Sequence, residues 1–247
     1  MVVTGGGGGI GGATCRRLAA EGGRVAVVDL HLAAASAVAE GIRAAGGVAE
    51  AFGCDIADRS SVEAAVAAVA DALGPVDVLV NNAGFDVFKP FLATTPDDWE
   101  RLIAVNLVGA LNMHHVVLPG MVERGRGRIV NIASDAARVG SSGEAVYAAC
   151  KGGLVALSKT LAREHARQGI TVNVVCPGPT ETALLAQVTA GAANPDKLTD
   201  AFRRAIPFGR LGQPDDLPGA IAFFASDDAA FVTGQVLSVS GGLTMAG

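Results

Sequence analysis

Aromatic and charged residues are scarce in this sequence of 247 residues: 4% are Phe, Trp or Tyr, with one tyrosine and one tryptophan, and 17% are charged. Half of the residues are hydrophobic, and the 33 glycines follow no fixed period, which excludes a disordered chain and a collagen-like fibre. The 24 acidic residues outnumber the 19 Lys and Arg. Because no long basic run offsets the net charge of −5, we expect no nucleic-acid partner.

Cysteine is also rare, and its spacing is unlike that of a metal or disulfide site. The four cysteines lie far apart without a CxxC pair, which predicts reduced thiols at Cys15, Cys54, Cys150 and Cys176. His114 and His115 are adjacent, so on a helix their side chains diverge by about 100°. The sequence therefore gives no support for a metal site.

Long apolar runs are missing as well. No stretch reaches ~18 consecutive apolar residues, and the N-terminus has no basic segment followed by an apolar run and a cleavage site. We therefore expect a soluble, cytoplasmic protein that binds no membrane. Since no Pro- or Ser-rich linker and no repeat divides the chain, we expect one domain over residues 1–247.

Short β-rich apolar runs alternate with longer segments of helical period. The predicted strands are residues 1–4, 24–29, 48–54, 76–81, 128–134, 171–176 and 236–239. The predicted helices lie near residues 11–22, 32–45, 60–73, 96–124, 144–168 and 215–226. This alternation predicts an α/β fold with a doubly wound, parallel, seven-stranded sheet (Rossmann fold) and helices on both faces. The first strand is short, so either the start at Met1 is tight or a few residues precede it.

Residues 180–214 interrupt the alternation with Gly, Asn and Pro and return to the sheet only after another helix. Ligands of such sheets bind beyond the carboxyl ends of the strands, and long insertions at that edge gate or shape pockets. We therefore predict a partly helical substrate lid over residues 180–214.

A glycine run connects the first predicted strand to the first predicted helix, at residues 4–11. Glycines at such a turn let backbone N–H groups approach a pyrophosphate. Asp29 ends the second strand, about twenty residues further on, where a carboxylate binds the adenosine ribose of NAD and repels the 2′-phosphate of NADP. Neither Gly12 nor His31 supplies a positive charge for that phosphate. The sequence thus predicts NAD as the cofactor.

Tyr147 is the only tyrosine, and Lys151 follows it by four residues, so both side chains lie on one face of a predicted helix. Ser134 lies at the end of the fifth predicted strand. A secondary alcohol that loses hydride to a nicotinamide needs a base, and a phenol can serve if its pKa falls towards neutrality. A lysine ammonium ~4 Å away lowers that pKa by up to roughly three units before desolvation opposes it.

These motifs occur together in order, and through them the chain resembles the short-chain dehydrogenase/reductase family over essentially its whole length. The matching positions are Thr4, Gly5, Gly9, Ile10 and Gly11 of the glycine loop, Asp55, Asn81, Asn82, Ala83, Gly84, Asn106, Ser134, Tyr147, Lys151, Pro177, Gly178 and Thr182. Such a set, correctly spaced, is highly specific.

The resemblance implies a catalytic tetrad. In it, Tyr147 is the acid/base, Ser134 binds the substrate oxygen, Lys151 holds the nicotinamide ribose and lowers the tyrosine pKa, and Asn106 anchors a water of a proton relay. The resemblance also implies the positions that contact the cofactor besides Asp29, Tyr147 and Lys151: Gly5, Gly8, Gly9, Ile10, Gly11, Asp55, Ile56, Asn82, Ala83, Gly84, Pro177, Gly178, Thr180 and Thr182.

Two positions depart from the family pattern. Gly12 stands where many relatives have a larger residue, which suits NAD. Ser240 replaces an acid that is common near the C-terminus of the family, so the contact of that acid is in doubt here.

A finer resemblance concerns the substrate. Residues 134–147 and 190–195 are similar to dehydrogenases that oxidise 2-hydroxycyclohexanecarbonyl-CoA to the keto thioester. Oxidation of a β-hydroxyacyl-CoA with NAD agrees with Asp29. The alternatives are a 3-oxoacyl-carrier-protein reductase, which normally uses NADPH, another NAD-dependent secondary-alcohol dehydrogenase, and a non-catalytic nucleotide-sensing protein, which the complete tetrad disfavours.

Further expectations concern the lid, the CoA phosphates and the assembly. The apolar lid residues either favour an apolar substrate or pack against the body or a partner subunit: Leu184, Leu185, Val188, Leu198 and Phe202. Arg138, or the group of Arg124, Arg126 and Arg128, can meet CoA phosphates unless these are simply exposed loop arginines. The resemblance implies a homotetramer with interfaces on the helices predicted over residues 96–124 and 144–168.

Overall fold

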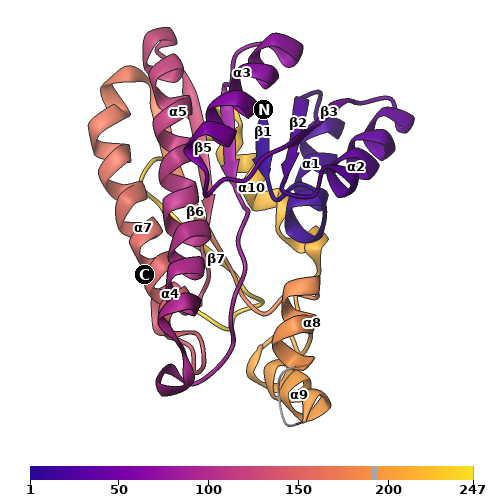
Figure 1. Ribbon diagram of the computed structural model, residues 1–247, viewed down its shortest axis with the longest axis vertical. Coiled ribbons are helices and arrows are strands. Elements are labelled where there is room, and N and C mark those ends of the chain that lie inside the picture. The colour runs from indigo at the N-terminus through magenta and orange to yellow at the C-terminus, as the bar shows by residue number, and fades with distance from the viewer. Residues whose placement is uncertain (191–193, 247) are drawn as a thin grey trace.

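The computed structural model describes residues 1–190 and 194–246. Within them, seven parallel strands form one sheet in the order β3-β2-β1-β4-β5-β6-β7 (Figure 1). The strands are β1 (Val2–Thr4), β2 (Arg24–Asp29), β3 (Val48–Gly53), β4 (Val78–Asn81), β5 (Gly127–Ile132), β6 (Ile170–Pro177) and β7 (Val236–Val239). The predicted fold class, a single-domain doubly wound parallel sheet, is confirmed, and every predicted strand overlaps an observed one.

The helices follow the predicted alternation with finer divisions. They are α1 (Gly9–Ala20), α2 (Leu32–Ala44), α3 (Arg59–Leu73), α4 (Pro96–Ile103), α5 (Gly109–Arg124), α6 (Ala136–Val139), α7 (Ala145–His165), α8 (Ala183–Ala190), α9 (Pro195–Ala205) and α10 (Pro218–Ala225). The short helix α6, directly after β5, was not predicted, because four residues are too few to show a helical period.

Each face of the sheet is covered by its own set of helices (Figure 1). α1, α2 and α10 pack on one face, and α3, α5 and α7 pack on the other. Successive strand residues point to opposite faces, so Val27 of β2 joins the first core cluster while Ala26 and Val28 join the second. Burial on both faces explains why the strands read as continuous apolar runs.

The predicted helix over residues 96–124 is interrupted by a π-helical turn, Ala104–Val108, between α4 and α5. A π turn withdraws backbone carbonyls from the regular helical hydrogen-bond ladder. The Asn106 side chain uses this: its Nδ2 donates to the Leu102 carbonyl at 3.0 Å and to the Phe85 carbonyl at 2.9 Å. The interruption therefore fixes Asn106 against the loop that follows β4.

The whole segment Pro96–Arg124 is long and apolar enough to cross a membrane, judged by length and composition alone. In the fold, α5 places Met113, Val117 and Met121 in the core cluster beneath the sheet. Ile103 and Leu111 stay exposed on the outer side of the same segment. Core burial thus explains the apolar residues on the inner face of this segment, but it does not explain those that are exposed on its outer face.

A buried polar cluster joins β4 and β5 to the helices behind them. Asn81 donates to Asn131 at 2.9 Å, and Asn131 donates to Ser158 on α7 at 2.8 Å. His114 of α5 lies within 3.4 Å of Asn81 Nδ2, and burial lowers its pKa to about 4, so the ring is neutral. His115 instead lies on the surface beside Arg59. The two histidines diverge, as predicted from their adjacency.

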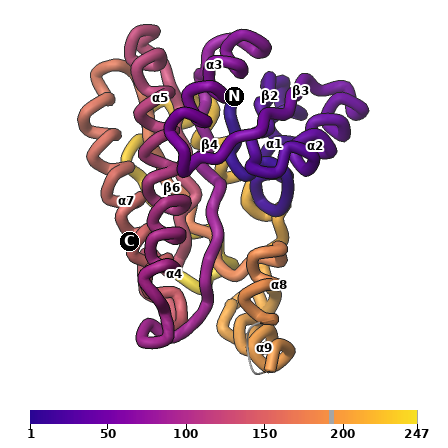
Figure 2. The backbone as a smooth tube through the Cα atoms, in the orientation of Figure 1, coloured from indigo at the N-terminus to yellow at the C-terminus, as the bar shows by residue number. Residues whose placement is uncertain are grey.

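The segment over residues 180–214 is partly helical, as predicted. Glu181 N donates to Gly212 O at 2.8 Å and Gly212 N donates to Pro179 O at 2.9 Å, which closes the base of the segment. From there α8 and α9 project beyond the carboxyl edge of the sheet, across from α4 (Figures 1 and 2). Residues 191–193, part of the segment that carries the finer resemblance, lie outside the described residues.

Close backbone contact fixes the start of α1. Gly5 and Gly9 have φ of +62° and +53°, a region that disfavours side chains. A Cβ on Gly11 would lie 2.1 Å from the Gly5 carbonyl oxygen and 2.5 Å from Asn82 Nδ2. Only glycine therefore allows α1 to begin this close to the end of β4.

Replacement of Gly11 by alanine tests this contact. We expect Gly11→Ala to lower the free energy of unfolding by about 1–3 kcal/mol or more, because backbone atoms must move apart. Gly41→Ala is the matched control: Gly41 is an exposed helical residue of α2 whose Cβ would meet nothing within 4 Å. That change removes freedom from the unfolded chain and should raise stability by about 0.4–1 kcal/mol. Denaturant unfolding followed by circular dichroism measures both, and equal effects of the two changes would contradict the close contact.

Candidate active site

The glycine loop is held by the carboxyl end of β4. Thr4 Oγ1 accepts hydrogen bonds from Asn82 N at 3.0 Å and from Ala83 N at 3.1 Å. In return, Asn82 Nδ2 donates to Thr4 O at 3.0 Å and to Gly5 O at 3.2 Å. Two predicted cofactor-binding segments, residues 4–11 and 82–84, thus form one rigid unit.

The open side of this loop fits a pyrophosphate. A Cβ on Gly8 would meet no atom within 4 Å, and Gly8 precedes α1 without any side-chain cap. The first N–H groups of a helix have no partner within the helix and carry its positive dipole end. An uncapped helix start over an open glycine provides backbone donors for an anion. The residues present therefore fit the diphosphate of a dinucleotide.

Asp29 lies at the end of β2 beside the loop. Its Oδ2 accepts from Gly7 N and its Oδ1 accepts from His31 N, both at 2.9 Å. These bonds hold the carboxylate at the loop, and each oxygen keeps a further lone pair. The sequence reasoning missed a positive charge here: Arg16 of α1 reaches within 3.6 Å of the position that a Cβ of Gly12 would take. Its signal was the spacing of four residues from Gly12 along α1.

The residues expected near the adenine differ in exposure. Asp55 is exposed, and its Oδ1 accepts from Ala57 N at 2.9 Å. The Ile56 side chain is buried against α5, where a Cβ on Gly109 would meet it at 2.6 Å. The side chain of Ile56 therefore belongs to the core, and only the backbone at this position is left for a ligand.

Tyr147, Lys151 and Ser134 come together at the carboxyl edge of β5. Tyr147 and Lys151 lie one turn apart on α7 and are only 8% and 3% exposed. Lys151 Nζ donates to the Ile132 carbonyl at 2.9 Å and lies 5.6 Å from the centre of the Tyr147 ring. Ser134, two residues beyond Ile132, lies close enough for its hydroxyl group to lower the pKa of Tyr147. The predicted neighbourhood of these three residues is present in the structure.

Asn106 completes the group from the π turn. Its Oδ1 is buried and has no hydrogen-bond partner among the described residues. A Cβ on Gly84 would lie 2.7 Å from that oxygen and 3.2 Å from Lys151 Nζ. Glycine at this position therefore leaves room between the Asn106 oxygen and the Lys151 nitrogen.

The pKa values differ from the expectation that Lys151 lowers the pKa of Tyr147. Burial raises the pKa of Tyr147, the carboxyl groups of Glu144 and Asp86 raise it further, and the hydroxyl group of Ser134 opposes them. Burial lowers the pKa of Lys151 to about 8. The physical reason is that both groups lose solvation, which is the largest cause of each shift.

The end of β6 brings the start of the predicted lid to the glycine loop. Thr182 Oγ1 accepts from Leu185 N at 3.3 Å, and its Cγ2 lies 3.4 Å from the position of a Cβ on Gly9. Thr180 Oγ1 donates to Gly178 O at 2.9 Å. Gly178, next to Pro177, faces Ser240, which would meet its Cβ at 2.7 Å. Ser240 Oγ accepts from Thr244 N at 3.2 Å, so it closes a local turn at the position where the family resemblance implies an acid.

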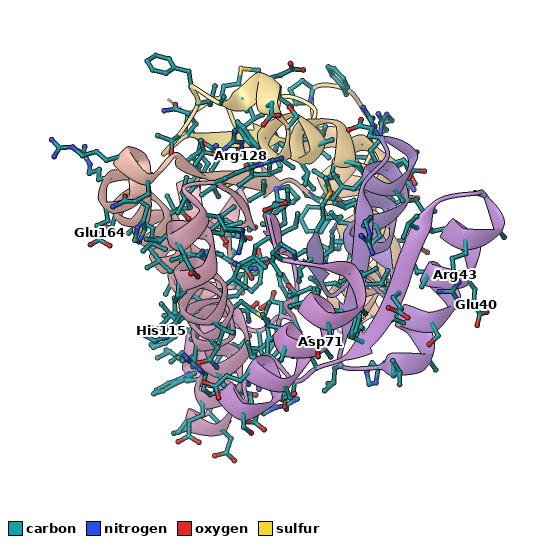
Figure 3. All side chains as sticks on the ribbon, turned by 90° about the horizontal axis from the view of Figure 1, so that it is seen from above. Glu40, Arg43, Asp71, His115, Arg128 and Glu164 are labelled. Carbon is teal, nitrogen blue, oxygen red and sulfur yellow. The ribbon has the colours of Figure 1, made fainter. Side chains whose placement is uncertain are left out.

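Three of the arginines considered for CoA phosphates, Arg138, Arg128 and Arg124, donate hydrogen bonds within the chain, and a contact of this group with CoA stays a prediction. Arg138 donates to Ser238 Oγ and to the Ala246 carbonyl. Arg128 donates to the carbonyls of Gly127, Gly169 and Ser226 at the start of β5, the edge opposite the site (Figure 3). Arg124 donates to the Val76 carbonyl before β4.

Two carboxyl groups near Tyr147 were missed. Asp86 lies in the loop after β4 and Glu144 directly precedes α7. Their signal in the sequence was position: Asp86 follows Gly84 by two residues, and Glu144 lies three residues before Tyr147 on the same helical face. Within the described residues, no group of three His, Cys, Asp or Glu side chains is arranged to hold a metal ion.

Comparisons with known proteins agree with this site. A family model described as enoyl-(acyl carrier protein) reductase matches residues 6–244. Acetoacetyl-CoA reductase of Rhizobium meliloti (strain 1021) is 40% identical over 98% of this chain and 96% of its own length. The crystal structure of levodione reductase superposes with a TM-score of 0.94 at 32% identity, covering 98% of this chain and 95% of that one.

A second solved structure bears on the cofactor. Gluconate 5-dehydrogenase from Burkholderia cenocepacia J2315, in complex with NADP and tartrate, has a TM-score of 0.92 at 38% identity and covers all of this chain and 95% of that one. None of these three proteins is described as a 2-hydroxycyclohexanecarbonyl-CoA dehydrogenase. The chain belongs to the short-chain dehydrogenase/reductase family, whose members bind a nicotinamide dinucleotide and interconvert secondary alcohols and ketones.

Proposed function

We propose that this protein is an NAD-dependent dehydrogenase that oxidises the secondary alcohol of a β-hydroxyacyl-CoA such as 2-hydroxycyclohexanecarbonyl-CoA. One observation carries the chemistry: Ser134, Tyr147, Lys151 and Asn106 lie together at the carboxyl edge of the sheet, where the glycine loop also opens. A non-catalytic nucleotide sensor needs no such group of buried polar side chains, which cost free energy to desolvate.

Tyr147 acts as the acid/base of the reaction. The dinucleotide, when bound, accepts the hydride from the alcohol carbon. Tyr147 Oη takes the hydroxyl proton during oxidation and returns it to the ketone during reduction, and Ser134 Oγ holds the same substrate oxygen. Lys151, whose pKa is near 8, carries a positive charge through most of the neutral range. The Asn106 oxygen and Lys151 Nζ hold a water between them that passes the proton to solvent.

The dinucleotide is held by the residues gathered around the glycine loop. The proposed set is Gly5, Gly8, Gly9, Ile10, Gly11, Asp29, Asp55, the backbone of Ile56, Asn82, Ala83, Gly84, Pro177, Gly178, Thr180 and Thr182, with Tyr147 and Lys151. Asp29 supports NAD, because a carboxylate at the ribose repels a 2′-phosphate. Arg16 supports the second candidate, NADP, because its guanidinium lies beside Gly12.

The substrate proposal combines the site with the relatives. The relative named acetoacetyl-CoA reductase acts on a β-oxoacyl thioester, which supports a CoA thioester as the substrate here. In the lid, α8 and α9 pack against each other and Val188 is buried, whereas Leu184 and Leu185 are only partly buried. These partly covered apolar side chains support an apolar acyl group. The alternatives are a 3-oxoacyl-carrier-protein reductase and another secondary-alcohol dehydrogenase.

The cellular setting is part of the same proposal. We place the enzyme in the cytoplasm, where NAD and CoA thioesters occur, with no nucleic-acid or membrane partner. Residues 180–214 serve as the lid that closes over the acyl group.

Formation of reduced nicotinamide tests the proposed reaction. With 2-hydroxycyclohexanecarbonyl-CoA we expect kcat/KM with NAD to exceed that with NADP by at least about tenfold, since a 2′-phosphate next to Asp29 costs 1.4 kcal/mol or more. 3-Hydroxybutyryl-CoA and a short diol serve as comparison substrates and should be poorer. Turnover with NADP alone, or with the linear thioester alone, would move the function to an acyl-thioester reductase.

Tyr147→Phe isolates the acid/base. This change removes one oxygen from a buried ring, so we expect kcat to fall by about a hundred- to ten-thousand-fold while NADH still binds. Steady-state rates and quenching of NADH fluorescence measure the two effects. Retained turnover would refute Tyr147 as the base, and lost NADH binding would indicate a collapsed site.

The oligomeric state is a homotetramer in this proposal. Ile103, Val108 and Leu111 are exposed apolar side chains on α4, the π turn and α5, and contact with another copy of the chain would remove them from water. Size-exclusion chromatography with light scattering should give four times the chain mass of 24.7 kDa. A mass of one chain, or a mass of two chains at every protein concentration measured, would contradict the tetramer.

A further inference from the structure

Two carboxyl groups without a role in the proposed reaction lie beside the acid/base. Asp86 belongs to the loop that follows β4, and Glu144 is the residue before α7. The two loops are docked: Lys89 N donates to Gly143 O at 2.9 Å, and a Cβ on Gly143 would meet the Phe88 ring at 3.0 Å. The contact brings the two acids together at the mouth of the site.

Only one of the two carboxylate oxygens of Asp86 has a hydrogen-bond partner among the described residues. Its Oδ1 accepts from Val87 N at 2.7 Å, whereas its Oδ2 is buried without a hydrogen-bond partner among the described residues. Burial raises the pKa of Asp86 to about 7, and the charge of Glu144 acts in the same direction. Asp86 therefore holds its proton into the neutral pH range, because a second negative charge beside that of Glu144 is unfavourable in a poorly solvated site.

The pair faces Tyr147. Glu144 lies three residues before Tyr147 on the same side of α7, and each of the two carboxylates raises the pKa of the phenol. The titratable groups around Tyr147 come from three parts of the chain: Glu144 and Lys151 from α7 and its start, Asp86 from the loop after β4, and Cys176 from β6. The neutral Ser134 hydroxyl lies after β5. Lys89, the nearest lysine in sequence to Asp86, pairs with Asp98 at 2.7 Å.

We propose that Asp86 and Glu144 are positioning residues that share one proton and, through their negative charge, set the pH at which Tyr147 loses its own. The inference rests on the proposed role of Tyr147 as the acid/base. Neither carboxyl group needs to touch the reacting atoms, because the effect is electrostatic and acts inside a poorly solvated site.

The sign of the effect follows from the charges. As the pH rises through the titration of the pair, the shared proton leaves and the pair becomes doubly negative. Formation of a phenolate next to it is then harder, so Tyr147 stays protonated to higher pH. Reduction of a ketone, which needs the phenol protonated, is maintained on the alkaline side. Oxidation, which needs the phenolate, is delayed to higher pH.

The decisive experiment compares pH profiles of kcat in both directions. Asp86→Asn, Glu144→Gln and the double variant keep the shape of each side chain and remove the charge. We expect the alkaline limb of reduction and the acid limb of oxidation both to move to lower pH, by about one unit or more in the double variant. Glu164→Gln is the matched control, an exposed glutamate at the far end of α7 that points away from the molecule (Figure 3), and its profile should overlay the wild type. Profiles of the double variant that coincide with the wild type would overturn the inference.

A readout without turnover separates this inference from the proposed function. The chain has a single tyrosine, so the ultraviolet absorbance of tyrosinate reports Tyr147 alone, and Tyr147→Phe supplies the blank. With NAD bound, we expect the double variant to form tyrosinate at lower pH than the wild type, with unchanged circular dichroism. If no alcohol is oxidised but the double variant forms tyrosinate at lower pH than the wild type, the proposed reaction is wrong and the inference about Asp86 and Glu144 is supported. If the alcohols are oxidised and tyrosinate forms at the same pH in both proteins, the inference about Asp86 and Glu144 is wrong.

Discussion

The contact between the glycine loop and the end of β4 is the constraint on which the site depends. Thr4 and Asn82 exchange side-chain and backbone hydrogen bonds across the sheet, at the central strand where its order reverses. Because a Cβ on Gly11 would overlap the Gly5 carbonyl, α1 can only start here if the residue is glycine. The same contact fixes the open helix terminus and the loop after β4, so anion binding and the position of Gly84 are settled together.

The second half of the site is built by burying polar groups and giving each a backbone partner. Lys151 Nζ reaches the Ile132 carbonyl, and Asn106 Nδ2 reaches two carbonyls, one of which the π turn provides. Buried polar atoms are costly unless paired, so each bond also locks the rotamer of its side chain. Among the buried side-chain atoms without a hydrogen-bond partner in the described part of the chain are one oxygen of Asn106 and one of Asp86.

The sequence predicted the strands, and the shared helix face of Tyr147 and Lys151, because their signals are local. Apolar runs bounded by glycine mark the strands, and the spacing of Tyr147 and Lys151 places both on one helix face. The π turn at Asn106 could not be predicted, since no residue in a uniform helical pattern reveals where the ladder shifts. The Asp86 and Glu144 pair also escaped prediction, because the docking of two loops 58 residues apart in sequence creates it. Ile56 was expected near the adenine, but only tertiary structure decides whether a side chain after a strand faces the ligand or the core.

Burial moves the pKa of Tyr147 up and that of Lys151 down, so the protein by itself favours a neutral phenol and weakens the ammonium. Both shifts have one cause: an isolated charge in a poorly solvated site is expensive. Two nearby carboxyl groups strengthen the effect on the phenol, and Lys151 Nζ lies 5.6 Å from the centre of its ring. Ionisation of Tyr147 therefore has to be compensated within the same cavity, by a positive charge or by a proton held on a neighbour. A phenol in this environment cannot ionise independently of its neighbours, so its protonation state depends on the charges of the whole site.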